Sequence, residues 1–142
     1  MTQPGFKIRA LGEIAIRCRD FEAMTAFYRD MLGLEVLSGG HRGTIVFFRI
    51  AEGYGGHTAV LALFDEAAGD VATGQASSLH HLAFTVDRAD QDRAEAFLAS
   101  NGIETRIEEF AWIGWRGLFM TDPDGNTVEL VAYDPEVGEP AP

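Results

Sequence analysis

The sequence contains a single cysteine, Cys18, and no long run of apolar residues. One cysteine excludes an internal disulfide and favours a reducing compartment. A membrane-spanning helix needs about 20 consecutive apolar residues, and no apolar segment follows Lys7 and Arg9, so we expect neither a membrane span nor a signal peptide. From these absences we expect a cytoplasmic protein.

Basic residues are scarce too, with 11 Lys and Arg against 22 Asp and Glu and a formal net charge of −11. This charge repels nucleic acid and anionic membranes, so we expect neither as a partner. The chain does contain 46% hydrophobic side chains in 142 residues, which is enough for one domain or for two small modules that share a core. The expected partners are a small molecule and, as a homodimer, a second copy of the chain.

The hydrophobic pattern of the first half, residues 8–64, predicts a β-α-β-β-β module. Residues 8–19 alternate as a strand, and Asp20 is the expected N-cap of a helix that ends at Gly33. Further strands are expected at 34–37, 44–50 and 57–64, with a flexible loop at 38–43.

The second half, residues 79–133, repeats this pattern. It predicts a strand at 81–86, a helix at 90–100, and strands at 103–107, 116–121 and 127–132, the last preceded by an Asp-Pro-Asp-Gly-Asn turn. Residues 65–78 are predicted to be a linker and residues 134–142 a disordered acidic tail with prolines. The predicted fold class is α+β, with two paired βαβββ modules that form an incomplete barrel around a central cavity.

Spacing supports the repeat. With Glu13 as the counterpart of His81, the helices end at Gly33 and Gly102, and Ala62 takes the position of Glu129 within a residue. Strand alternation turns His81 away from the apolar face formed by its neighbours, and does the same for Glu13 and Glu129. The repeat therefore predicts four equivalent inward positions, three of which carry side chains that can bind a metal.

Glu13, His81 and Glu129 together indicate a metal site. Two carboxylates brought close without a cation would repel, whereas a divalent ion removes the conflict. One imidazole and two carboxylates suit Fe(II), Mn(II), Ni(II), Co(II) or Zn(II), with positions left for substrate. Taken singly, each residue is more simply interpreted as a solvated strand glutamate or a structural histidine. The hypothesis of a metal site rests on the combination of the three.

Four segments then resemble the vicinal oxygen chelate superfamily, which includes glyoxalase I, extradiol dioxygenases, and fosfomycin- and bleomycin-resistance proteins. They are Ile-Ala-Ile-Arg-Cys-Arg-Asp, Ala-Phe-Tyr-Arg-Asp-Met-Leu-Gly-Leu-Glu, His-His-Leu-Ala-Phe and Asp-Pro-Asp-Gly-Asn-Thr-Val-Glu-Leu. The resemblance covers about residues 8–133. It implies paired βαβββ modules that curl around a metal site, usually in a dimer.

The resemblance also assigns roles to residues. It implies that Glu13, His81 and Glu129 bind the metal, with Glu13 and Glu129 also catalytic. Ala62 occupies the position where glyoxalase I has a catalytic glutamate, so this chain is closer to the three-ligand pattern of the dioxygenases and fosfomycin-resistance proteins, although those carry histidine where this chain has Glu13. Arg17 matches an arginine with which glyoxalase I holds a carboxylate of glutathione; a structural salt bridge is the alternative.

Aromatic residues complete the candidate substrate site. Tyr54 flanks a Gly-Gly turn and is a candidate lid residue, with a plain surface loop as the alternative. Candidates for the wall of an apolar or aromatic substrate pocket, or else for a dimer contact, are Phe110, Trp112 and Trp115.

The expected function is a divalent-metal-dependent enzyme, of the lyase, isomerase or dioxygenase class, that acts on a small substrate able to chelate the metal through adjacent oxygens. One alternative is a metal-free protein of the same fold that binds or sequesters a small molecule. Another is a structural dimer whose site has decayed, with Ala62 as the first loss.

Overall fold

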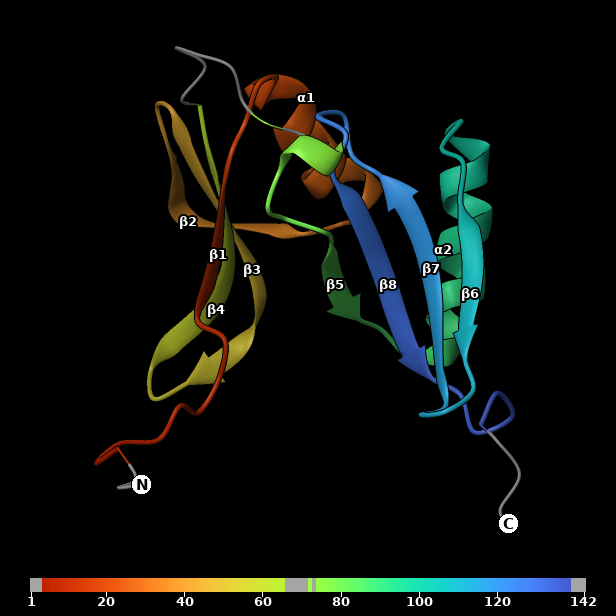
Figure 1. The fold of residues 1–142 in the computed structure, drawn as a ribbon. Coiled ribbons are helices and arrows are strands. Elements are labelled where there is room, and N and C mark those ends of the chain that lie inside the picture. Colours follow the sequence, from red (N-terminus) through yellow and green to blue (C-terminus); the bar gives the residue numbers. More distant parts are fainter. Residues whose placement is uncertain (1–3, 66–71, 73, 139–142) are drawn as a thin grey trace. The chain divides into compact units, whose positions relative to one another are not determined.

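The computed structural model describes residues 4–65, 72 and 74–138, which form two compact units, Met1–Val71 and Ala72–Pro142. Each unit contains a four-stranded sheet, and the strands are labelled in Figure 1. Each predicted module falls within one unit, and the fold is α+β without a closed barrel, as predicted. Most of the predicted linker, residues 66–71 and 73, lies outside the described residues.

The first unit has the strand order β1-β4-β3-β2. Strands β1 (Glu13–Arg17) and β4 (His57–Phe64) are parallel, whereas β3 (Ile45–Tyr54) is antiparallel to both β4 and β2 (Glu35–Arg42). Helix α1 (Phe21–Ala26), continued by the π-helical turn η1 (Phe27–Met31), connects β1 to β2.

The second unit repeats this topology with the order β5-β8-β7-β6. Strands β5 (Leu82–Thr85) and β8 (Thr127–Tyr133) are parallel, and β7 (Trp115–Thr121) is antiparallel to both β8 and β6 (Arg106–Phe110). Helix α2 (Arg88–Ser100) connects β5 to β6, and a short 3₁₀ helix η2 (Gly74–Ala76) precedes β5. No helix among the residues described is long and apolar enough to span a membrane.

The predicted alternation of β1 is confirmed. Ile16 and Cys18 are buried, whereas Glu13 and Arg17 are exposed. Because strand neighbours point to opposite faces, Glu13 and Arg17 share the face that lies away from this buried row. The apolar side chains buried in this unit include Met24, Tyr28, Val46, Phe48, Leu61 and Leu63.

The predicted N-cap of the first helix is confirmed as well. The Ala23 backbone N–H donates to Asp20 Oδ1 at 3.0 Å, which satisfies one of the free donors at the helix start. Gly33, with φ of +69°, follows the last turn, as expected for a residue that ends a helix in the left-handed region.

The loop predicted at 38–43 is wrong, because β2 continues to Arg42. The register of β2 against β3 shifts between Val36 and His41, so the glycines there belong to an irregularity inside a strand. A glycine in a strand often marks such a bulge, and sequence alone does not distinguish it from a loop. Other boundaries also move. The strand predicted at 8–19 is a strand only over 13–17, that predicted at 44–50 continues to residue 54, and that predicted at 103–107 lies at 106–110.

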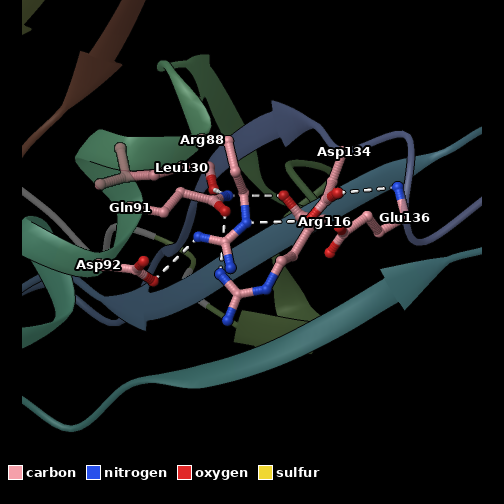
Figure 2. A network of polar contacts seen from close by, with 7 residues as sticks. All are labelled: Arg88, Gln91, Asp92, Arg116, Leu130, Asp134 and Glu136. Carbon is pink, nitrogen blue, oxygen red and sulfur yellow. Dashed lines mark hydrogen bonds and ion pairs between the residues drawn. The ribbon is translucent and has the colours of Figure 1, made fainter.

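A buried glutamine ties α2 to its sheet (Figure 2). Gln91, which has no exposed surface, donates from Nε2 to the carbonyl oxygens of Arg116 at 2.6 Å and Leu130 at 2.8 Å, and accepts from Arg116 Nη1 at 3.0 Å. Since buried backbone carbonyls are costly without a partner, this side chain fixes the helix over β7 and β8.

The predicted turn before β8 is confirmed. Asp122 Oδ1 accepts from the backbone N–H groups of Asp124 at 3.0 Å and Asn126 at 2.9 Å, and its Oδ2 accepts from Asn126 Nδ2 at 2.9 Å. All three side chains are buried. The turn therefore fixes where β8 begins, and with it which face of the strand carries Glu129.

The tail expected from residue 134 begins with a turn in the structure. Asp134 Oδ2 accepts from Arg88 Nε at 2.9 Å, and its Oδ1 accepts from the Glu136 backbone N–H at 3.0 Å, as Figure 2 shows. Residues 139–142 lie outside the described residues, so their disorder stays a prediction.

Candidate functional site

Strand register places the predicted ligands of the second unit on one face. Ala83 pairs with Glu129, which pairs in turn with Phe119 on β7. Side chains of paired residues lie on the same face of a sheet. His81 comes two residues before Ala83, so it extends the same row beyond the start of β5.

The structure brings His81 and Glu129 together. His81 Nε2 lies 3.3 Å from Glu129 Oε1, and the two side chains are 34% and 7% exposed. The imidazole is therefore reachable from solvent, while the carboxylate is held beneath it. This direct contact links a residue in front of the first strand of the unit to the middle of its last strand.

These two side chains line a cavity of about 690 Å³ within the second unit. Its lining combines the His81–Glu129 pair with two aromatic rings, one arginine and the segment before β5. The lining residues are Gly74, Gln75, Ser77, Ser78, Leu79, His80, His81, Arg106, Glu108, Phe110, Phe119, Gly125, Asn126, Thr127 and Glu129. A cavity of this size with convergent polar groups suits a small molecule.

Burial raises the pKa of Glu129 above its ordinary value of 4.5, and the nearby Glu108 carboxylate adds to the increase. The charge of His81 and its hydrogen bond oppose the shift but do not cancel it. Glu129 is therefore a carboxyl group that accepts a proton more readily than one in water.

A second histidine contacts the first. His80 Nδ1 and His81 Nδ1 are 2.8 Å apart, so one ring donates and the other accepts. If His81 donates from Nε2 toward Glu129 as a neutral ring, its Nδ1 accepts from His80. If the lone pair of Nε2 is instead used to bind a ligand, His81 carries its proton on Nδ1 and donates to His80. The pair thus suits both states of His81.

Gly117 makes room for the Glu129 carboxylate, a role that the sequence analysis did not assign. A Cβ at this position would overlap Glu129 Oε2 and would come within 2.7 Å of Phe119 Cε2. Because Gly117 is in the middle of β7 and its φ is not positive, space rather than backbone conformation explains the glycine. The signal in the sequence was an isolated glycine inside a predicted strand.

Phe119 and Arg106 form the wall beside the metal-ligand candidates. The Phe119 ring packs edge-on against His81, with ring centres 6.0 Å apart, and the Arg106 guanidinium carbon lies 4.4 Å from the centre of the same ring. Phe110 also packs against Phe119, with ring centres 6.5 Å apart. Neither Arg106 nor Phe119 was predicted from the sequence as a site residue.

Three predicted site residues lie in the first unit on the equivalent face of its sheet. Glu13 pairs with Val60, Ala62 pairs with Ala15, and Arg17 pairs with Phe64. Glu13 and Arg17 are exposed, whereas Ala62 has no exposed surface. Tyr54 ends β3, is 57% exposed, and stacks with the Arg9 guanidinium at 5.7 Å from the ring centre.

The two predicted tryptophans pack against each other instead of lining the cavity of the second unit. Their ring centres are 6.4 Å apart, and Trp112 and Trp115 are 71% and 44% exposed. Phe110, the third aromatic residue predicted for the wall, does line that cavity.

The donors of the second unit fit two positions around a divalent ion. Two donors about 2.1 Å from one ion are separated by about 3.0 Å at a right angle and about 3.4 Å at the tetrahedral angle, and His81 Nε2 and Glu129 Oε1 are 3.3 Å apart. No group of three or more His, Cys, Asp or Glu side chains able to hold a metal is found among the described residues. The third predicted ligand, Glu13, belongs to the other unit.

A sequence profile of the Glyoxalase/Bleomycin resistance protein/Dioxygenase superfamily matches residues 10–130. The chain belongs to this superfamily. The match confirms the resemblance that the four short segments indicated. It covers both βαβββ units, from the strand that carries Glu13 to the strand that carries Glu129.

The chain is also similar to individual proteins and solved structures. The Bacillus subtilis (strain 168) "Uncharacterized protein YwkD" is 32% identical over 125 residues, which cover 87% of this chain and 96% of that protein. The lactoylglutathione lyase of Agrobacterium tumefaciens is 26% identical, with a TM-score of 0.67 over 92% of this chain and 96% of that one. A glyoxalase/dioxygenase from Nostoc punctiforme has the same fold, with a TM-score of 0.75, 24% identity, and coverage of 95% and 97%.

Proposed function

We propose that this protein is a divalent-metal-dependent enzyme that acts on a small molecule with two adjacent oxygens, in a lyase, isomerase or dioxygenase reaction. The observation that carries the proposal is the His81–Glu129 pair at the wall of the cavity, with its two donors 3.3 Å apart. Family membership and the similarity to the lactoylglutathione lyase support it.

The proposed metal ligands are His81 and Glu129, with Glu13 as the third. His81 offers its Nε2 lone pair and Glu129 a carboxylate oxygen. Glu13 opens β1, as His81 precedes β5, each two residues before the alanine that pairs with β4 or β8. Two carboxylates and one imidazole are hard, mostly anionic ligands that suit Fe(II), Mn(II), Ni(II), Co(II) or Zn(II).

A bound divalent ion would polarise the substrate oxygens and stabilise negative charge that develops on them. The chain itself would supply orientation and proton transfer. His80 holds the His81 ring through the contact between their Nδ1 atoms, and Gly117 leaves the space in which the Glu129 carboxylate lies. We propose Glu129 and Glu13 as the two acid-base groups that would take a proton from the substrate and return it.

Metal binding tests this proposal. The protein should be purified without chelator, analysed for metal content, and melted in the presence of each of the five ions. We expect stoichiometric metal and an increase in Tm, since a ligand at 100 times its Kd stabilises the folded state by about 2.7 kcal/mol. His81→Ala and Glu129→Gln should weaken the affinity at least about tenfold, whereas the control variants His41→Ala and Glu22→Gln, in the first unit and exposed, should not.

If no preparation contains stoichiometric metal and none of the five ions raises Tm, the metalloenzyme proposal fails. A second function then becomes the better one, namely metal-free binding and sequestration of a small molecule. The observation that favours it is that His81 Nε2 and Glu129 Oε1 already contact each other at 3.3 Å beside the cavity. Ligand-induced stabilisation that persists in chelator would support it.

A further inference from the structure

The cavity of the second unit contains one basic side chain besides its histidines. Among the described residues that line it, Arg106 is the only lysine or arginine, in a chain with a net charge of −11. Arg106 pairs with Phe119, which pairs with Glu129, so the arginine shares their face of the sheet. Arg106 is therefore the side chain of this cavity that is best suited to attract an anionic ligand.

The guanidinium is held in place by an aromatic ring. Its carbon lies 4.4 Å from the centre of the Phe119 ring, and Phe119 is itself 6% exposed and packed against His81. Stacking on a fixed ring restricts the rotamers of an arginine and so reduces the entropy lost when it binds a ligand. A single phenyl ring therefore separates the guanidinium from the His81 imidazole.

Most of the hydrogen-bonding capacity of Arg106 is available. Its Nη1 contacts Glu108 Oε1 at 2.5 Å, and the two side chains are 57% and 48% exposed. Nε and Nη2 make no polar contact with any other described residue. Exposed ion pairs are weak because water and salt screen them. The planar edge of the guanidinium can therefore receive an incoming carboxylate through two parallel hydrogen bonds.

We propose that the cavity takes a small carboxylic acid whose carboxylate pairs with Arg106 while its polar oxygens lie at His81 and Glu129. This inference rests on the proposed function for the second end of the ligand only. The rings of Phe119 and Phe110 line the path between the two ends, so a short hydrocarbon or aromatic spacer fits there. The recognised group is the anionic carboxylate rather than the spacer.

Because Glu108 pairs with Arg106, the proposal can be tested with two variants that should change the affinity for acids in opposite directions. Its carboxylate competes with the ligand for Arg106 and repels an incoming anion. Arg106→Gln should therefore weaken the binding of acids, whereas Glu108→Gln should strengthen it. A merely structural Arg106–Glu108 pair predicts that both variants have the same small effect.

The test compares acids with their uncharged esters. The probes are 3,4-dihydroxybenzoate and 3,4-dihydroxyphenylacetate, each beside its methyl ester, with affinities measured by calorimetry on Zn(II)-loaded and on metal-free protein. Both members of a pair carry the same adjacent oxygens, so their difference reports the carboxylate alone. We expect wild type to bind at least one acid about tenfold more tightly than its ester. That preference should fall below about threefold in Arg106→Gln and at high salt, and should increase in Glu108→Gln.

Arg93→Gln is the matched control, because Arg93 is an exposed arginine of α2 that pairs with Asp90 outside the cavity. Equal affinity for acids and esters in wild type, or a preference that survives Arg106→Gln, would overturn the inference. If the protein binds no metal and the acid preference still appears, the inference stands and the metalloenzyme proposal fails. If metal binds and no preference appears, the inference alone fails.

Discussion

The two units have the same strand order and the same register at the centre of the sheet, yet they fill this part of the sheet face in opposite ways. In the second unit the last strand carries Glu129 and the neighbouring strand carries Gly117. In the first unit the same two register positions carry Ala62 and Ile45, because Phe47 pairs with Ala62 as Phe119 pairs with Glu129. A large and a small side chain have exchanged places.

This exchange shows what a functional position requires of its neighbours. A buried carboxylate needs both a partner and space, and the second unit supplies His81 and Gly117. In the first unit the alanine is fully buried, and the position equivalent to the glycine carries the half-buried side chain of Ile45. We therefore infer that the first unit uses the position of Ala62 for core packing, whereas the second unit keeps space there for the Glu129 carboxylate.

The largest effect is expected when the first unit is made to resemble the second. Ala62→Glu places a carboxylate at a fully buried position, and we expect it to lower the free energy of unfolding by more than about 3 kcal/mol. Urea denaturation measures this, with Ala96→Glu on the exposed side of α2 as a control expected to change stability by less than about 0.5 kcal/mol.

A double-mutant cycle with Ile45→Gly sharpens the comparison. If a large side chain at position 62 requires a small one at position 45, the two substitutions should partly compensate each other. The variant that combines Ala62→Glu with Ile45→Gly should then be less destabilised than the sum of the two single variants by at least about 0.5 kcal/mol. Additive effects would mean that the two positions are independent and that the exchange is coincidental.

A smaller effect is expected when the second unit is made to resemble the first. Gly117→Ala should force the Glu129 carboxylate to move, at a cost of about 1 to 3 kcal/mol in stability. It should also weaken metal binding about tenfold or more, because the donor is displaced from His81. Gly5→Ala is the control, since a Cβ there meets no atom within 4 Å and its φ is not positive.

Shortening the displaced side chain should repair the site. We expect Glu129→Asp to restore part of the stability lost in Gly117→Ala, although it is neutral or harmful in the wild-type protein. A double variant no more stable than Gly117→Ala would contradict the spatial role assigned to this glycine.

The smallest effect concerns pH. Burial raises the pKa of Glu129 above 4.5, so the folded protein holds this proton more tightly than the unfolded chain does. The stability that this proton contributes is complete below pH 4.5 and is lost as the pH rises through the raised pKa. In metal-free protein, Glu129→Gln should therefore become progressively more stable relative to wild type as the pH rises from 4.5 toward 8. Urea denaturation at several pH values measures this difference, and a difference that is constant or that shrinks would contradict it.

Local patterns predicted the repeated modules, the N-cap at Asp20 and the turn at Asp122 because each depends on neighbours in the chain. They also predicted that Ala62 and Glu129 are equivalent, which the matching strand registers bear out. The local pattern gave a wrong prediction at residues 38–43. A strand irregularity that contains two glycines has the same sequence pattern as a loop, and only the pairing with the neighbouring strand distinguishes the two.

The superfamily, the strand faces and the convergence of His81 and Glu129 were predictable from the sequence, because the four short segments, strand periodicity and the internal repeat can be recognised without any knowledge of packing. What surrounds that pair depends instead on tertiary packing. The space above Gly117 and the stacking of Arg106 on Phe119 both arise between side chains of neighbouring strands. Contacts of this kind depend on register and on side-chain volume at distant positions, which no local pattern contains.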